Sequence, residues 1–450
     1  MVPSPNPMSP QKAVRRLSLS EEHPVALAAR IASRFDLPAP VEAHDFAEKG
    51  NINHHTFVVE ALGGGERREY ILQQINQQVF TRPRAVMASM LACIEAQRRN
   101  VAEGALRPEE RWETVSLVPT RDGRPFLEID DRRGYGCWRL MVRIANARTF
   151  KSLGEIADSE QRLWIAEQAG SGLALYGTLT SGIDVSSLSS PLPGYRDTRV
   201  YYDQLLSVLA GARTPGEAER YLPKDPEVRQ ATERHFLIHL TEVEYRRRAS
   251  LPEVQPFLAL LRDNEAFALQ LLTGMETGRI RRSAIHGDTK LDNFLFDAVT
   301  GQVKALVDLD TILPHTWLAD WGDMVRSLSN VAGEKEAHRE RIQVDMDIYR
   351  AVARGFLRSA RNVTAAELDL MVEAVQVIAL ELGMRFLTDY LRGDSYFKLG
   401  PADPPDLNKT RGLAQLTLFQ RLRERAGETR AALLALRAEL GVTGDTACAS

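Results

Sequence analysis

Apolar residues follow two different spacings along this chain, and the change between them divides it into two parts. Near the N-terminus the spacing is helical, with apolar side chains at Val25, Leu27, Ala28, Ile31 and Phe35. We predict a helix that begins after Ser20, a residue type that caps helices, and ends at Leu37-Pro38.

Residues 40–145 favour an antiparallel sheet with one inserted helix. The predicted strands are 41–46, 56–62, 69–75, 112–119, 125–129 and 136–144. Three glycines from Gly63 onward separate the second strand from the third, as is typical of a hairpin turn. The inserted helix is predicted from Pro83 to Arg99, because proline is favoured at the first position of a helix.

After residue 145 the spacing is mainly helical. The predicted helices are 159–179, 200–209, 226–248, 256–272, 320–329, 334–357, 365–391 and 407–440. Thr364 and Glu367 have the spacing of a capping box at the start of one of them. Two short strands, 294–296 and 303–307, interrupt the helices as a predicted hairpin. The predicted fold class is therefore α+β, with a small antiparallel lobe and a large helical lobe.

The same pattern suggests four segments. Residues 1–20 are rich in proline and serine and are predicted to be disordered. Residues 21–145 form the predicted N-lobe, and residues 146–440 form the predicted C-lobe. Residues 441–450 are predicted to be a frayed tail.

Composition narrows the classes of function. The 450 residues carry a formal net charge of -3, which argues against a nucleic-acid-binding surface as the main function. Cys93, Cys137 and Cys448 are scattered without the spacing of a zinc site or a disulfide framework, so we expect free thiols in a reducing cytoplasm. No apolar run has the length of a membrane span, and no secretory signal pattern is present. We expect a cytoplasmic protein without nucleic-acid or membrane partners, as a monomer or a simple homo-oligomer.

The candidate chemistry lies in one segment, His286-Gly-Asp-Thr-Lys-Leu-Asp-Asn293, followed by Val307-Asp308-Leu-Asp310. Kinase-type phosphoryl transfer needs a carboxylate near the nucleophile's proton, and an amide and a carboxylate for Mg²⁺. Asp288 is the candidate base, while Asn293 and Asp308 offer the hard oxygen ligands that suit Mg²⁺. Asp310 is an extra carboxylate that would help to hold a second Mg²⁺ or contact the substrate.

Each of these residues alone would have a plain structural explanation, as a turn, a cap or a polar strand end. Together, with a hydrophobic hairpin between them, they favour phosphoryl transfer. We interpret His286 as a structural residue that bonds the loop backbone rather than as a proton carrier. Lys290 would either neutralise the transferred phosphate or be a solvated side chain.

This segment resembles the aminoglycoside phosphotransferase and choline kinase superfamily, in which H-x-D-x-x-x-x-N is followed by an I/V-D strand end. The resemblance implies a protein-kinase-like bilobal fold that uses ATP and Mg²⁺, with the nucleotide bound by the N-lobe and the acceptor by the C-lobe. It also implies that Asp320 braces the catalytic loop, with Asp323 as the alternative residue for that role.

Further motifs resemble the bacterial N-acetylhexosamine 1-kinases, from about residue 45 to about residue 415. They include Tyr70-Ile-Leu-Gln-Gln-Ile-Asn76, Trp321-Gly-Asp-Met-Val-Arg326, Leu382-Gly-Met-Arg-Phe-Leu-Thr-Asp-Tyr390 and Gly393-Asp-Ser-Tyr-Phe397. This narrower resemblance implies transfer of the ATP γ-phosphate to the anomeric C1 hydroxyl of N-acetylglucosamine or N-acetylgalactosamine. One alternative is a kinase that acts on another acceptor, namely another sugar, choline, homoserine or an aminoglycoside. The other alternative is a non-catalytic pseudokinase.

The nucleotide contacts depart from the protein-kinase pattern. The glycine-rich loop is absent, and Asn51 and Asn53 lie in a turn with a single glycine that would either cover phosphate or join two strands. Gln73 occupies the place expected for the strand lysine, and glutamine bonds without supplying charge. The backbone after Met141 would contact the nucleotide base. Because main-chain contacts do not depend on the side chain, the choice between ATP and GTP stays open, and the family resemblance implies ATP.

The acceptor site is predicted on one long helix. Arg385 and Asp389 are four residues apart and therefore share a face, with Tyr390 next to them. The pair would either form an ion pair on the helix surface or point into the cleft and bond sugar hydroxyls.

Overall fold

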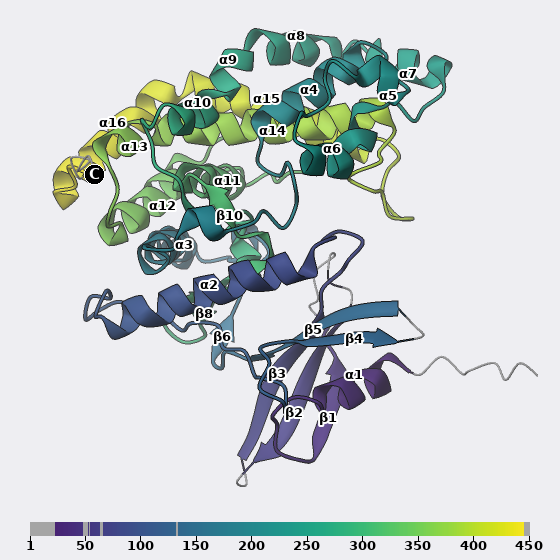
Figure 1. Cartoon of the computed structure of the whole chain (residues 1–450). Helices are drawn as coiled ribbons and strands as arrows, with labels where there is room; N and C mark the ends of the chain where they lie inside the picture. Colours follow the sequence, from purple (N-terminus) through teal and green to yellow (C-terminus); the bar gives the residue numbers. More distant parts are fainter. Residues whose placement is uncertain (1–22, 48–52, 54, 64–65, 132–133, 445–450) are drawn as a thin grey trace, which may run out of the picture. The chain divides into compact units, whose positions relative to one another are not determined.

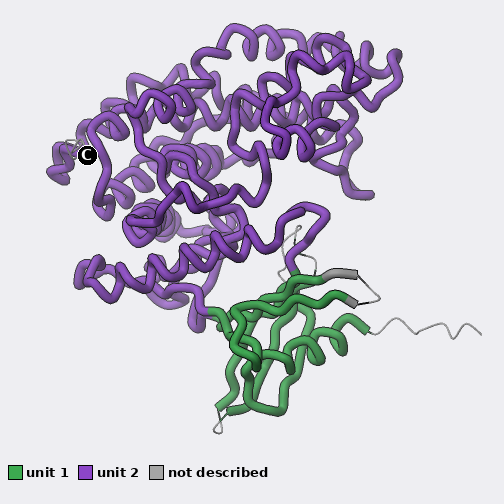
Figure 2. Tube along the Cα trace, in the orientation of Figure 1, with its two compact units in different colours: residues 1–74, 117–143 green, residues 75–116, 144–450 purple. Residues whose placement is uncertain are grey.

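The computed structural model describes residues 23–444, except 48–52, 54, 64–65 and 132–133 (Figure 1). The predicted disordered segment 1–20 and the last six residues lie outside the described part. The chain forms two compact units (Figure 2). We call residues 1–74 and 117–143 the sheet unit, and residues 75–116 and 144–450 the helical unit.

The sheet unit is a five-stranded antiparallel sheet with one helix. Its elements are α1 (Pro24–Ala32), β1 (Val41–Asp45), β2 (Thr56–Gly63), β3 (Glu66–Gln74), β4 (Leu127–Asp131) and β5 (Gly134–Val142), in the strand order β1-β2-β3-β5-β4. Apolar side chains on one face of the sheet, such as Val59 and Leu72, pack with Ile31 of α1 and with Phe35. The expected strand 112–119 is wrong, because this segment makes only an isolated bridge from Leu117 to Met141.

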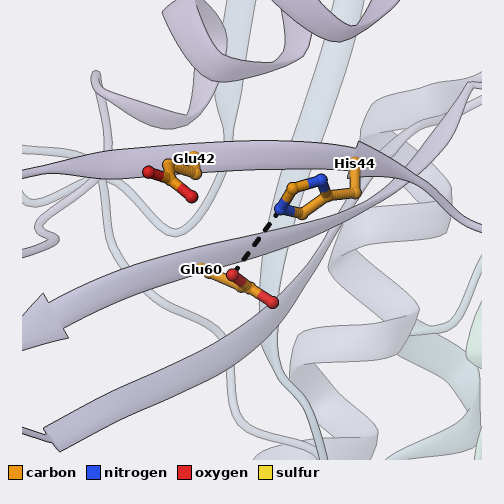
Figure 3. Close-up of side chains that lie close together, drawn as sticks. All are labelled: Glu42, His44 and Glu60. Carbon is orange, nitrogen blue, oxygen red and sulfur yellow. Dashed lines mark ion pairs between the residues drawn. The ribbon is translucent and has the colours of Figure 1, made fainter.

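The opposite face of the sheet carries polar side chains. Glu42 on β1 and Glu60 on β2 are directly opposed in the register, a position in which like charges destabilise a sheet. His44 lies beside them, with its Nε2 3.6 Å from Glu60 Oε2 (Figure 3). Arg67 also pairs with Glu60, and its positive charge offsets the repulsion.

The helical unit contains most of the helices and the short strands. Its helices are α2 (Pro83–Ala102), α3 (Ser159–Leu179), α4 (Thr198–Leu209), α5 (Pro215–Ala218), α6 (Pro226–Thr232), α7 (Glu242–Ala249), α8 (Gln255–Asp263), α9 (Glu265–Ala268), α10 (Gln270–Glu276), α11 (Trp317–Ser329), α12 (Met346–Ser359), α13 (Ala365–Asp369), α14 (Met371–Arg392), α15 (Leu407–Glu424) and α16 (Ala426–Leu440). Its strands are β6 (Ala147–Arg148), β7 (Ser283–Ile285), β8 (Phe294–Asp297), β9 (Val303–Leu306) and β10 (Leu313–His315). The predicted α+β class, with a small antiparallel sheet and a large, mainly helical part, is confirmed.

Helix α14 is buried along almost its whole length and packs against α4, α11 and α15 (Figure 1). Two glycines allow α3 and α12 to cross closely. A Cβ at Gly170 would lie 2.1 Å from the Val352 carbonyl oxygen, and one at Gly355 would lie 1.8 Å from that of Glu167. Helix α3 also packs against β9, the strand that leads into Asp308, so this crossing supports the segment with the candidate chemistry.

Several predicted boundaries need correction. The helix expected over 226–248 is broken after Phe236, because its backbone bonds elsewhere: Ile238 N donates to Ala212 O and His239 N to Arg392 O. The helix expected over 256–272 is divided into α8, α9 and α10, and the one expected from residue 334 begins at Met346.

The predicted division at residue 145 also differs from the observed units. Residues 75–116 belong to the helical unit, because α2 packs against α3 and against the short 3-10 helix η5 (Leu309–Thr311).

The capping box of Thr364 and Glu367 is present at the start of α13. Cys93 and Cys137 are buried and form no disulfide, and Cys448 lies outside the described residues. Within the described residues, no helix has both the length and the apolar content needed to span a membrane.

Candidate functional site

The candidate catalytic loop, residues 286–293, begins where strand β7 ends. His286 is completely buried, and its Nε2 lies 2.8 Å from the carbonyl oxygen of Val307, the residue before Asp308. Its Nδ1 accepts a hydrogen bond of 3.3 Å from the backbone N–H of Asp288, which leaves Nε2 as the protonated nitrogen. These are the contacts of a residue that ties the loop to the second half of the motif.

Asp320, in the first turn of α11, fixes the backbone of the same loop. Its carboxylate accepts from the N–H of His286 at 2.7 Å and from the N–H of Gly287 at 2.9 Å. Its carbonyl oxygen accepts from Thr289 Oγ1 at 2.8 Å. Burial raises the pKa of Asp320, although the two backbone N–H groups and His286 oppose this shift. Asp320 therefore makes the contacts expected of the residue that braces the catalytic loop.

Asp288 follows on a partly exposed stretch of the loop. Its Oδ2 lies 3.1 Å from the ammonium of Lys290, and 3.3 Å from Nδ2 of Asn293. Asn293 Nδ2 also donates to the carbonyl oxygen of Asp288 at 2.7 Å, so its amide oxygen is the atom left for a cation. The short 3-10 helix η4 (Leu291–Asn293) produces this arrangement by folding Asn293 back over Asp288.

Lys290 connects both halves of the motif electrostatically. Burial lowers the pKa of its ammonium, but Asp288, Asp292 and Asp308 together raise the pKa above its ordinary value. Lys290 therefore stays charged, close to three carboxylates.

Asp308 and Asp310 follow strand β9 in different environments. Asp308 is exposed and adopts left-handed backbone geometry, with φ +63°, at the start of η5. Asp310 is buried within η5. Thr311 Oγ1 donates to the carbonyl oxygen of His286 at 2.7 Å, which joins η5 to the start of the candidate catalytic loop.

Two further residues of this site were missed by sequence reasoning. Tyr195 donates its hydroxyl to the carbonyl oxygen of Gly287 at 2.7 Å, and Arg196 Nη2 donates to the same oxygen at 3.0 Å. Arg196 is buried with φ +62°, and its Nη2 also lies 2.7 Å from Asp323 Oδ2. About 90 residues separate them from the loop, and they belong to no motif, so no local sequence signal marks them.

Asp323 is buried in an ion-pair network with Arg196 and Arg326. Burial alone would raise its pKa, but Arg326 and Arg196 lower the pKa to about 2. Its carboxylate therefore anchors Arg196, which in turn holds the carbonyl oxygen of Gly287.

Arg385 lies among aromatic side chains. Its guanidinium carbon is 4.5 Å from the ring centre of Tyr201, and 5.4–5.6 Å from those of Tyr195, Tyr396 and Phe397. We call these four rings the aromatic cluster. Because Tyr195 also bonds Gly287, the cluster lies next to the candidate catalytic loop.

The predicted pair of Arg385 and Asp389 is wrong. Asp389 is fully buried, and it pairs with Arg392, whose Nε lies 2.8 Å from Oδ1. Its carboxylate also accepts from the backbone N–H groups of residues 395, 396 and 397. Through these bonds the Asp389 carboxylate holds the loop after α14. We therefore correct the expected substrate contact of Asp389 to a structural role.

Tyr390 also differs from the prediction. Its side chain is buried, and the guanidinium of Arg248 stacks over its ring at 4.4 Å. Arg248 Nη1 further donates to the Tyr390 carbonyl oxygen at 2.7 Å. Tyr390 thus joins α7 to α14, and the expected substrate contact is replaced by this packing contact.

The predicted nucleotide residues lie in the sheet unit, and Asn51 is outside the described residues. Asn53 is buried, and its carbonyl oxygen accepts from Thr56 Oγ1 at 2.8 Å. Gln73 Nε2 donates to Thr56 Oγ1 at 3.2 Å. Met141, partly buried near the end of β5, pairs with Ile71 of β3.

Alignment with one solved structure, that of an aminopropanol kinase, supports the kinase-like fold. The structure of a microcompartment-associated aminopropanol kinase aligns with a TM-score of 0.52 at 15% identity, over 90% of this chain and 98% of that one. A putative aminoglycoside phosphotransferase from Ralstonia eutropha aligns with a TM-score of 0.47 at 12% identity, over 88% and 97% of the two chains. An ethanolamine kinase from Plasmodium vivax aligns with a TM-score of 0.41 at 10% identity, over 84% and 81%.

The sequence itself gives the assignment. Residues 47–356, which include β2 to β5, the candidate catalytic loop and most of α12, match the phosphotransferase enzyme family. This match covers more than half of the chain. The chain therefore belongs to the phosphotransferase enzyme family.

Proposed function

We propose that this chain is a Mg²⁺-dependent kinase that transfers the γ-phosphate of ATP to the anomeric hydroxyl of an N-acetylhexosamine. The observation that carries the choice of acceptor is the position of Arg385. Its guanidinium occupies the centre of the aromatic cluster, beside the loop that holds Asp288.

Asp288 is the proposed proton acceptor. In the transfer, a bond forms between the C1 oxygen and the γ-phosphorus while the bond from the γ-phosphorus to the β-phosphate oxygen breaks, and the hydroxyl proton passes to Asp288. An anomeric hydroxyl is more acidic than an ordinary alcohol, so one carboxylate suffices as base. The two backbone bonds to Asp320 and the bonds to the Gly287 carbonyl oxygen support a fixed position for this carboxylate.

The donor atoms in the loop fit Mg²⁺. An amide oxygen from Asn293 and carboxylates from Asp308 and Asp310 are hard oxygen ligands, and the short segment between β9 and β10 carries both carboxylates. These three residues would hold the ion, which neutralises phosphate charge when bound. Lys290 adds a fixed positive charge beside Asp288, and would attract the transferred phosphate.

The charge of the aromatic cluster supports a neutral acceptor. Aromatic rings around a small site are a common receptor for a cationic amine, but here the chain's own guanidinium fills that position. Burial, together with the charges of Arg392 and Arg385, lowers the pKa of nearby His235 to about 2. The His235 ring packs edge-on against Tyr396. A choline, amino alcohol or aminoglycoside would therefore meet positive charge, whereas sugar oxygens would accept hydrogen bonds from Arg385.

A panel of candidate acceptors tests the proposed choice of substrate. ADP release in the presence of ATP and Mg²⁺ would be measured with N-acetylglucosamine, N-acetylgalactosamine, choline, ethanolamine, homoserine and an aminoglycoside. We expect the highest kcat/KM for an N-acetylhexosamine, and no turnover with its 1-O-methyl glycoside, which lacks the anomeric hydroxyl. A cationic acceptor with the highest kcat/KM, or phosphorylation of the methyl glycoside, would reject the proposal.

The catalytic role is tested with Asp288→Asn. We expect kcat to fall by about 10²–10⁴-fold, with ADP affinity unchanged. Asp369→Asn is the matched control, because Asp369 is an exposed acid that pairs with Arg437 elsewhere in the same unit. Near-normal turnover of Asp288→Asn would remove Asp288 from the mechanism.

A further inference from the structure

The polar face of the sheet unit holds a row of three side chains on neighbouring strands. Thr56 on β2 is opposite Gln73 on β3, and Gln73 is opposite Arg139 on β5. Arg139 donates from both Nε, at 3.0 Å, and Nη2 to the same oxygen of Gln73. Arg139 is one of the largest fully buried side chains, with an exposed fraction of 1%.

The guanidinium determines how the Gln73 amide is oriented. Arginine has only donors, so the Gln73 atom that faces it must be the oxygen. The NH₂ group of Gln73 is then directed to the other side, where one N–H donates to Thr56 Oγ1. The amide therefore keeps a second N–H that points away from Arg139.

In protein kinases, a lysine on the third strand pairs with the nucleotide phosphates. Gln73 lies on the third strand of this sheet, β3, and supplies no charge. Arg139 supplies a permanent charge at the next strand, in contact with the same side chain. A charge in a buried site acts over a longer range than one in water, because the surrounding dielectric constant is lower.

We propose that Arg139 and Gln73 together form the phosphate-binding element of the sheet unit. Gln73 donates its free N–H to a nucleotide phosphate oxygen, and Arg139 holds the amide in that orientation and supplies the positive charge. The inference rests on the proposed kinase function for its ligand, a nucleoside diphosphate or triphosphate. It assigns Arg139 a role in nucleotide binding, whatever the acceptor is.

The test compares two ligands that differ only in phosphate. The affinities of ADP and adenosine would be measured by calorimetry, without any acceptor, for the wild type and for Arg139→Gln. We expect the variant to bind ADP about 10- to 100-fold more weakly, the range of a charge-assisted hydrogen bond, and adenosine as well as before. Arg68→Gln, which removes an exposed arginine from β3, is the matched control and leaves both affinities unchanged.

A second variant separates charge from folding. Gln73→Lys combined with Arg139→Gln moves the positive charge from β5 to β3. We expect this double variant to regain most of the ADP affinity lost by Arg139→Gln alone. Regained affinity cannot come from a merely structural effect, because the packing of Arg139 is still absent.

Two results would overturn the inference. One is an equal loss of ADP and adenosine affinity in Arg139→Gln without recovery in the double variant, which would make Arg139 purely structural. The other is unchanged ADP affinity in Arg139→Gln. A failure of the proposed sugar acceptor would appear only in the turnover panel, and it would leave these binding measurements as they are.

Discussion

Replacing Gly287 with alanine tests whether the candidate catalytic loop must pass as close to η5 as the structure shows. Gly287 has φ +84°, and a Cβ there would lie 2.6 Å from the Thr311 carbonyl oxygen and 3.1 Å from Leu313 Cδ2. Left-handed backbone geometry costs an alanine about 1–2 kcal/mol. The contact with Thr311 comes in addition, and since its partner is backbone, no side-chain rotation relieves it.

A matched glycine separates these two costs. Gly278 has φ +71° in the same unit, and a Cβ there would meet no atom within 4 Å. Gly278→Ala should therefore lose about 1–2 kcal/mol of stability and keep its kcat. Gly287→Ala should lose more stability, and its kcat should fall by about 100-fold, because a shift of about 1 Å next to Asp288 has an effect of that size.

The assay is urea denaturation combined with ADP release under saturating substrates. If Gly287→Ala and Gly278→Ala have the same stability and the same kcat, the close approach between the loop and η5 has no functional consequence. That result would refute the reasoning on loop position.

Three other predictions concern the surroundings of the loop. Arg385→Met should raise the KM for the sugar by about tenfold with a small change in kcat, since one charged hydrogen bond is lost; an unchanged KM would exclude Arg385 from the acceptor site. Asp389→Asn should lower the free energy of unfolding by about 3 kcal/mol, because it breaks a buried pair with Arg392; a stable variant with a raised KM would restore the substrate role. The pKa of Asp323 falls to about 2 in the folded state, so this residue should contribute about 2 kcal/mol to the free energy of unfolding above pH 4. This contribution should be lost as the pH falls towards 2. Urea denaturation of the wild type and of Asp323→Asn should therefore converge over that range, and a constant difference would contradict the assignment.

The loop could be predicted from sequence because its chemistry is local. Asp288 and Asn293 are five residues apart, and Asp308 follows one hairpin later, so spacing alone indicates their proximity. Asp320 also lies close in sequence, at the start of the helix after that hairpin. Strand alternation likewise identified β1, β2 and β3, since one face of each is buried.

The remaining features depend on pairings between distant segments. Tyr195 reaches Gly287 only because the chain before α4 returns to the loop, and no motif records that return. The pairing of Arg139 with Gln73 depends on β3 and β5 being neighbours across 66 residues. Helical spacing correctly placed Arg385 and Asp389 on one helix. The Asp389 carboxylate, however, pairs with Arg392, three residues after Asp389, and not with Arg385.

The central claim is tested most directly by the position of the phosphate in the product. The product of a reaction with ATP, Mg²⁺ and N-acetylglucosamine would be examined by ³¹P NMR with proton correlation. We predict one phosphomonoester whose phosphorus couples to the anomeric proton. A phosphomonoester coupled to any other sugar proton, or no phosphorylated sugar with an active enzyme, would contradict the assignment as a sugar 1-kinase.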